Sequence, residues 1–175
     1  MGTNDWMAGG SPSDGVSHHG EGYDVMQVCL NGHQITDCAE LLPHHKKPFC
    51  PECGEKTITA CPECNAPIQG HLKGVLSAHS SPIPNNCQNC GTAYPWRQDA
   101  IASAIEILQM QLEEQDAAEV AKLIPAIAIE TPKTHLAALK LKRLMSKLAK
   151  PAYDISIKVA SDLASETAKR TLGMK

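Results

Sequence analysis

The fold of this chain is decided by residues 50–64, which read CPECGEKTITACPEC and hold two cysteine pairs, each with two intervening residues. A third pair of the same spacing is Cys87-Cys90, and Cys29 and Cys38 complete a set of eight cysteines. A C-x-x-C step turns both sulfurs toward one point, so that one Zn²⁺ can bind both at about 2.3 Å. Because the step is repeated, the pattern is a strong prediction of metal binding, whereas a single pair would be a weak one.

Disulfides, thiol redox chemistry and iron are weaker interpretations of the same cysteines. Disulfides need an oxidising compartment, and the first ten residues, MGTNDWMAGG, lack the basic and apolar segments of a secretion signal, so we expect a cytoplasmic protein. Thioredoxin-type chemistry belongs to a βαβ pattern, which this loop-rich segment lacks. Rubredoxin-type iron would fit the C-P-x-C-G step at residues 50–54. We expect two zinc ions per chain, and no membrane span, because no run of 18 apolar residues occurs.

The first predicted zinc site uses three cysteines and a fourth ligand from the same segment. The cysteines are Cys29, Cys50 and Cys53. A hairpin with a three-residue loop and Gly32 in the left-handed conformation places Cys29 and His33 on one face, whereas a two-residue loop separates them. We expect the three-residue loop and therefore His33 as the fourth ligand. Cys38 is the alternative, and a site that uses neither would be completed by water or by another histidine.

The second predicted site needs only cysteines. Its ligands are Cys61, Cys64, Cys87 and Cys90. The segment between its two halves is rich in Gly, Pro and Ser, which predicts a loop or a loose hairpin with little helix. The four half-sites could also interleave, as in RING-type domains, with the first joined to the third and the second to the fourth. The short step of seven residues from Cys53 to Cys61 favours two sequential modules.

The chain is predicted to be an α+β protein with two small β-rich zinc ribbons followed by a C-terminal α-helical domain. The expected boundaries are 1–22 for a disordered arm, 23–58 for the first ribbon, 59–96 for the second, and 97–175 for the helices. Aromatic residues make up only 3% of the chain, with Phe49 as the single phenylalanine. Metal–ligand bonds are therefore expected to replace apolar burial in the ribbons.

Apolar periodicity predicts four helices after the cysteines. Ile101, Ile105, Leu108 and Leu112 repeat at helical spacing within a helix of about residues 98–114. A capping box of Asp116 and Glu119 predicts a second helix, which Pro125 ends or kinks. The third is expected from Thr131-Pro132 to about Ala149, and the last from Pro151 to about Gly173.

The charge of the chain is divided between its two parts. Residues 1–130 hold 6 Lys/Arg and 16 Asp/Glu, a net charge of −10, while residues 131–175 hold 10 and 3, a net charge of +7. The third predicted helix carries a basic group, Lys140, Lys142, Arg143 and Lys147. Opposite fields suit docking of the parts on each other or on a charged partner, and the lysines could equally be a solvated helix face.

The cysteine pattern resembles a bacterial family of tandem zinc-ribbon proteins known as a domain of unknown function. The runs Val28-Cys29-Leu30-Asn31-Gly32-His33 and Phe49-Cys50-Pro51-Glu52-Cys53-Gly54, followed by two more C-x-x-C pairs, carry the resemblance over about residues 23–96. The resemblance implies two bound zinc ions and a cytoplasmic protein, and it implies no reaction. Cys38 lies outside these motifs.

The expected function is non-enzymatic. Catalytic zinc keeps an open position for water, whereas sites of four cysteines, or of three cysteines and a histidine, are closed. We expect an interaction or adaptor module, or a regulatory module, which binds a protein partner or itself through the helical region. The alternative is a nucleic-acid-binding protein that uses the basic C-terminal helices, because the ribbons offer few cations for phosphates.

Overall fold

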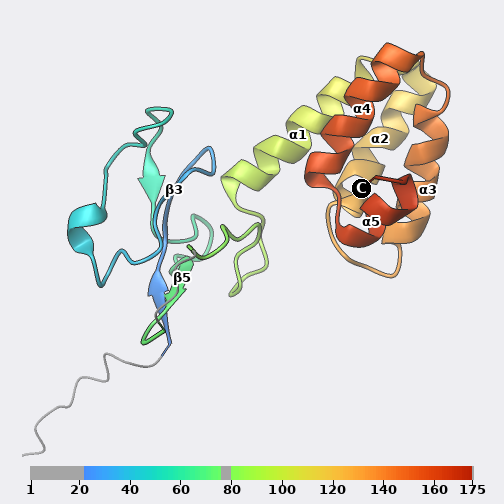
Figure 1. The fold of residues 1–175 in the computed structure, drawn as a ribbon. Coiled ribbons are helices and arrows are strands. Elements are labelled where there is room, and N and C mark those ends of the chain that lie inside the picture. Colours follow the sequence, from blue (N-terminus) through green and yellow to red (C-terminus); the bar gives the residue numbers. More distant parts are fainter. Residues whose placement is uncertain (1–21, 76–79, 175) are drawn as a thin grey trace, which may run out of the picture.

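The computed structural model describes residues 22–75 and 80–174, so the arm predicted over residues 1–22 lies outside the described residues except for Gly22. The α+β prediction is confirmed, because small β-sheets with two cysteine clusters come first and helices follow (Figure 1). The strands are β1 (Tyr23–Val25), β2 (Gln27–Cys29), β3 (Gln34–Thr36), β4 (Thr57–Ile58) and β5 (Gln69–Leu72), with a 3-10 helix at Pro43–His45. The helices are α1 (Pro95–Gln109), α2 (Glu114–Ile127), α3 (Thr134–Met145), α4 (Lys150–Leu163) and α5 (Glu166–Leu172).

Two small antiparallel sheets form the ribbon half. Strands β1 and β2 are separated only by Met26 but belong to different sheets, since β1 pairs with β5 while β2 lies between β3 and β4. Strand β5 and its pairing with β1 were not predicted, since the segment was expected to be a loop or a loose hairpin. Gly70 permits this pairing, because a Cβ there would collide with the carbonyl oxygen of Asp37.

The two halves have cores of different kinds. In the ribbon half the buried cluster is Met26, Val28, Cys61, Ile68, Cys87 and Tyr94. In the helical half sixteen buried residues form one cluster, to which all five helices contribute. The predicted apolar face of α1 packs into it, with Leu108 fully buried. None of the helices in the described ranges is long and apolar enough to cross a membrane.

The predicted starts of the first two helices are wrong in detail. Helix α1 begins at Pro95, three residues earlier than expected, because proline at the first helical position needs no N–H partner. The capping box does not form: α2 begins at Glu114, and the carboxylate of Asp116 accepts a hydrogen bond from Lys147 at 2.6 Å instead. Pro125 lies inside α2, which continues two residues further to Ile127.

The last two helical predictions also need correction. Helix α3 begins at Thr134, later than expected, and ends at Met145. The single helix expected after Pro151 is two helices, α4 and α5, separated at Ala164 and Ser165. The break has a tertiary cause, since the N–H of Ser165 donates to the carbonyl of Ile127 at 2.9 Å.

Candidate metal centres

Three tight turns of the same construction carry the C-x-x-C pairs. In each, the residue after the second cysteine has a positive φ: 75° at Gly54, 58° at Asn65 and 77° at Gly91. Its N–H donates to the carbonyl oxygen of the first cysteine at 2.8–2.9 Å. Isolated bridges close the bases of the turns: Phe49 with Lys56, Ala60 with Pro67, and Asn86 with Ala93. Both sulfurs of a pair are therefore held on one side of a rigid turn.

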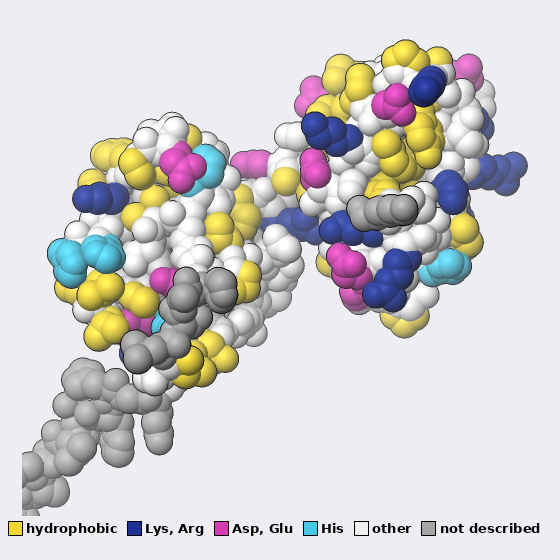
Figure 2. Space-filling view, in the orientation of Figure 1, with side chains coloured by type: hydrophobic (Ala, Val, Ile, Leu, Met, Phe, Trp, Pro, Cys, Tyr) yellow, Lys and Arg dark blue, Asp and Glu magenta, His cyan; other side chains and the backbone are white. Residues whose placement is uncertain are grey.

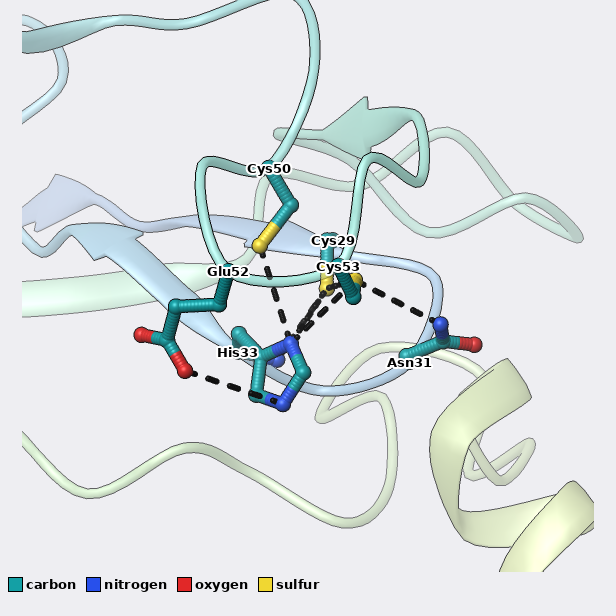
Figure 3. Close-up of polar contacts among 6 residues, drawn as sticks. All are labelled: Cys29, Asn31, His33, Cys50, Glu52 and Cys53. Atoms are coloured by element: carbon teal, nitrogen blue, oxygen red, sulfur yellow. Dashed lines mark hydrogen bonds and ion pairs between the residues drawn. The ribbon is translucent and has the colours of Figure 1, made fainter.

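The first cluster gathers four ligand atoms from two hairpins. Cys29, His33, Cys50 and Cys53 place one ligand atom each within 4.8 Å of all the others. Figure 3 shows the imidazole of His33 below the three sulfurs, with Nδ1 directed at them. The distances from this nitrogen are 3.5 Å to the sulfur of Cys29, 3.6 Å to that of Cys50 and 3.3 Å to that of Cys53.

These spacings match a tetrahedral metal and exclude a disulfide. Two thiolates bound at about 2.3 Å with tetrahedral angles lie about 3.8 Å apart, and a thiolate and an imidazole nitrogen lie about 3.5 Å apart. The sulfurs of Cys29 and Cys53 are 3.8 Å apart, whereas a disulfide requires about 2.05 Å. A zinc ion therefore fits between the four groups without movement of the backbone.

The hairpin that carries Cys29 and His33 has the three-residue loop that the sequence favoured. The N–H of Cys29 donates to the carbonyl of His33 at 3.0 Å, and Gly32 has a φ of 88°. This left-handed residue brings the backbone N–H of His33 to 3.2 Å from the sulfur of Cys29. The loop thus places the sulfur and the imidazole on one face.

Cys38 lies apart from both clusters. Its sulfur donates to a carboxylate oxygen of Asp37 at 3.6 Å. Burial, together with the charge of Asp37, raises the pKa of the Cys38 thiol to about 11. A protonated thiol beside a carboxylate is a poor ligand, so the geometry favours His33 over Cys38 as the fourth group.

The second cluster is made of cysteines alone and follows the sequential order. Cys61, Cys64, Cys87 and Cys90 place their sulfurs within 4.8 Å of one another. The sulfur–sulfur distance is 3.8 Å between Cys61 and Cys90 and 3.6 Å between Cys64 and Cys87. The interleaved alternative is therefore wrong, because each cluster uses neighbouring half-sites.

Three polar side chains that the sequence reasoning missed surround the ligands. Asn31 donates its amide to the sulfur of Cys53 at 3.4 Å, and Asn89 donates to Cys64 at 3.5 Å. Glu52 lies on the other side of His33, 3.8 Å from its Nε2 (Figure 3). A carboxylate there favours the tautomer with the proton on Nε2, which leaves Nδ1 free for a metal. Their place in the sequence was the available signal, since each of these residues lies within a turn that carries two metal ligands.

The turns supply charge stabilisation as well as shape. The backbone N–H of Glu55 is the main cause that lowers the pKa of Cys53 to about 6, and that of Cys90 does the same for Cys87. Burial instead raises the pKa of Cys61 to about 11. A cation between these sulfurs would hold all of them as thiolates. The donor sets, S₃N and S₄ at tetrahedral spacing, are those of structural zinc.

One of the comparisons with known proteins gives a match. The chain belongs to a family described as uncharacterized proteins conserved in bacteria (DUF2321), whose model matches residues 22–172. The match includes both cysteine clusters and all five helices. Neither the curated proteins nor the solved structures give a match.

Proposed function

We propose that this protein is a non-enzymatic adaptor whose two zinc ions hold the ribbons rigid while the helical half binds a protein partner. The observation that carries the proposal is the closed ligand set of each cluster. Four protein groups lie at tetrahedral spacing in both, which leaves no coordination position for a substrate or a reactive water. Zinc in such sites contributes folding free energy rather than chemistry.

The partner surface that we propose is the outer face of α3, defined by Leu136, Leu139 and Arg143. These residues are three and four positions apart and so lie on one stripe of the helix. Leu136 is 57% exposed and Leu139 is 46% exposed, although the rest of the helix packs its leucines inward. Two exposed leucines beside an arginine suit a partner helix that carries apolar side chains flanked by carboxylates.

Cations extend this face on both sides, and some already have partners. On the α2 side, Lys140 lies 3.7 Å from Glu119 and Lys147 lies 2.6 Å from Asp116. On the α5 side, Lys142 donates to the carbonyl of Thr171 at 3.4 Å. In the face drawn in Figure 2 most of the Lys and Arg side chains lie on the helical half. Among the described residues Arg143 is the member of the basic group with neither an ion pair nor a hydrogen bond from its side chain, so it is the cation of this face most available to a partner's carboxylate.

A protein partner is better supported than nucleic acid. Phosphate binding gains nothing from exposed leucines, and α2 neutralises two of the four cations of the basic group. The ribbon half would also repel a polyanion: residues 22–96 carry four lysines against six carboxylates, and the thiolate sites would add about −1 and −2 with zinc bound.

A photocrosslinking residue at position 139 in the full chain, expressed in bacteria, tests the proposal. We expect it to capture one defined protein, whereas the same residue at the exposed Leu41 of the ribbon half does not. Binding of that protein, once purified, should weaken at least tenfold in Leu139→Asp and Arg143→Glu, and should be unchanged in Lys158→Glu on α4.

Three outcomes would contradict the proposed function. Capture of a second copy of this chain would assign the face to self-association, and analytical ultracentrifugation would then show an oligomer that Leu139→Asp dissociates. Tight, steeply salt-dependent binding to DNA or RNA at about 0.15 M salt, lost in Arg143→Glu, would assign it to nucleic acid. Hydrolytic activity lost with zinc would remove the non-enzymatic premise.

A further inference from the structure

Residues 94–96 connect the two metal centres with the helical half. Tyr94 follows the second half of the second cluster and is 2% exposed, within the ribbon core. Its ring stacks on that of Trp96, with centroids 4.6 Å apart and planes at 14°. The indole N–H of Trp96 donates to the carbonyl of Pro84 at 3.1 Å. The stacked pair is therefore fixed to the second ribbon.

Trp96 also lies against the loop of the first cluster. A Cβ placed on Gly32 would lie 2.9 Å from the Cβ of Trp96 and 3.1 Å from its Cγ, so only glycine fits against the indole. Gly32 lies directly before His33, whose imidazole completes the first cluster. The loop that holds one ligand group of the first metal thus rests on a side chain fixed to the second ribbon.

The next residue continues the connection into the helices. Arg97 is buried at 9% exposure and donates to the carbonyl of Ala128 at 2.8 Å and to that of Leu163 at 3.1 Å. These carbonyls lie at the C-terminal ends of α2 and α4, where the helix dipole favours a cation. Figure 1 shows α1 leaving the ribbon half as one continuous helix. The start of α1 is therefore held from both sides.

We propose that the stacked pair Tyr94–Trp96 couples the two zinc sites, so that each bound ion strengthens binding of the other and both together fix the start of α1. The proposal rests on the zinc sites of the proposed function, and it goes beyond them by making the ions interdependent. With the first site empty, the loop at Gly32 loses its fixed shape and its contact with Trp96. The stack beside the second cluster then loses one of its two supports.

Zinc affinities measured in the full chain by competition with a chromophoric chelator test the coupling. With the first site disabled by Cys50→Ser, we expect the affinity of the second site to fall about tenfold, within the usual range of 5–150-fold for coupled sites. With the second site disabled by Cys61→Ser, the first should weaken by the same factor, because coupling is reciprocal.

Substitutions at Tyr94 and Trp96 test whether the coupling between the zinc sites depends on the stacked rings. Trp96→Leu keeps an apolar side chain but removes the stack, and the effect of Cys50→Ser on the second site should then fall below twofold. Tyr94→Phe keeps the stacked ring, and the tenfold effect should persist. In the Cys50→Ser chain, amide hydrogen exchange over residues 96–100 should be faster than in the unmodified chain.

The outcomes separate this proposal from the proposed function. Fewer than two zinc ions in the unmodified chain would overturn both. Two ions whose affinities are independent within twofold would overturn only the coupling, as would a tenfold effect that survives in Trp96→Leu. Should Trp96→Leu lose both ions, Trp96→Met, which fills the space with an apolar chain but has no ring to stack, replaces it. Full coupling without faster exchange at residues 96–100 would remove the part of the proposal that concerns α1.

Discussion

The ribbon half and the helical half of this protein are stable for different physical reasons. The ribbon half buries a cluster of six residues, two of which are cysteines of the second metal centre, and its strands are two to four residues long. The helical half buries sixteen residues in one cluster to which all five helices contribute. Short strands over so small a core have marginal stability in water, whereas the helical half has the continuous apolar core that is usual in globular domains.

The comparison indicates which half would need a metal for its stability. In the ribbons, two tetrahedral sites take the place of an apolar interior, and structural zinc contributes about 10–16 kcal/mol in small domains. In the helices, the burial of apolar surface, which contributes about 25 cal/mol per Å², suffices to stabilise the fold. Each half should therefore respond to a treatment that leaves the other nearly unchanged.

The largest expected effect is that of metal removal. A strong chelator, or Cys50→Ser together with Cys61→Ser, should unfold the ribbons, because the thiolates then have no shared cation. Far-UV circular dichroism should retain most of its helical signal, while amide exchange becomes fast over residues 23–90. Loss of the helical signal together with the metal would show that the helices depend on zinc.

The converse perturbation should act on the helices alone. Leu141 is fully buried in α3, and Leu141→Ala should lower the free energy of unfolding of the helical half by about 2–5 kcal/mol. Chemical denaturation followed by circular dichroism measures this, and the zinc content should stay unchanged. Leu136→Ala, on the exposed side of the same helix, is the matched control, with an expected change of about 0.5 kcal/mol or less.

A smaller, local effect distinguishes the two candidates for the fourth ligand. His33→Ala removes a group that lies 3.3–3.6 Å from three sulfurs. Zinc affinity at the first site should therefore fall by more than the 10–100-fold loss that is typical when a residue hydrogen-bonded to a metal ligand is removed. Cys38→Ser should leave that affinity unchanged, since the Cys38 thiol contacts Asp37 instead. The opposite ranking in a chelator competition would make Cys38 the ligand.

The smallest expected effect concerns Glu52. This carboxylate is 65% exposed and lies 3.8 Å from Nε2 of His33, so water screens much of its influence. Glu52→Gln should therefore weaken zinc binding at the first site by only a few-fold, and the second site should change less. An effect as large as that of His33→Ala would indicate that Glu52 is itself a ligand.

The sequence predicted the metal clusters better than the strands around them. Ligand turns are local, so the spacing of Cys50 and Cys53 and the positive φ of Gly54 could be inferred from adjacent residues. Strand β5 depends on pairing with β1, more than forty residues earlier, and on the space left at Gly70. Periodicity within one segment contains no information on such a partner.

The helices show the same limit of local signals. The apolar face of α1 was predicted, because Leu108 and its neighbours follow helical spacing. The break between α4 and α5 was not predicted, because no glycine or proline marks it. It arises where Ser165 donates to Ile127 and where Arg97 binds the carbonyl of Leu163. Both contacts join residues more than thirty positions apart.

The central claim is that two structural zinc ions hold the ribbon half, and native mass spectrometry of the intact chain, supported by elemental analysis, tests it most directly. We expect the folded protein to carry a mass excess of two zinc ions per chain, with one ion lost in Cys50→Ser and one in Cys61→Ser. Fewer than about 1.5 zinc ions per chain, or stoichiometric iron in their place, would contradict the claim.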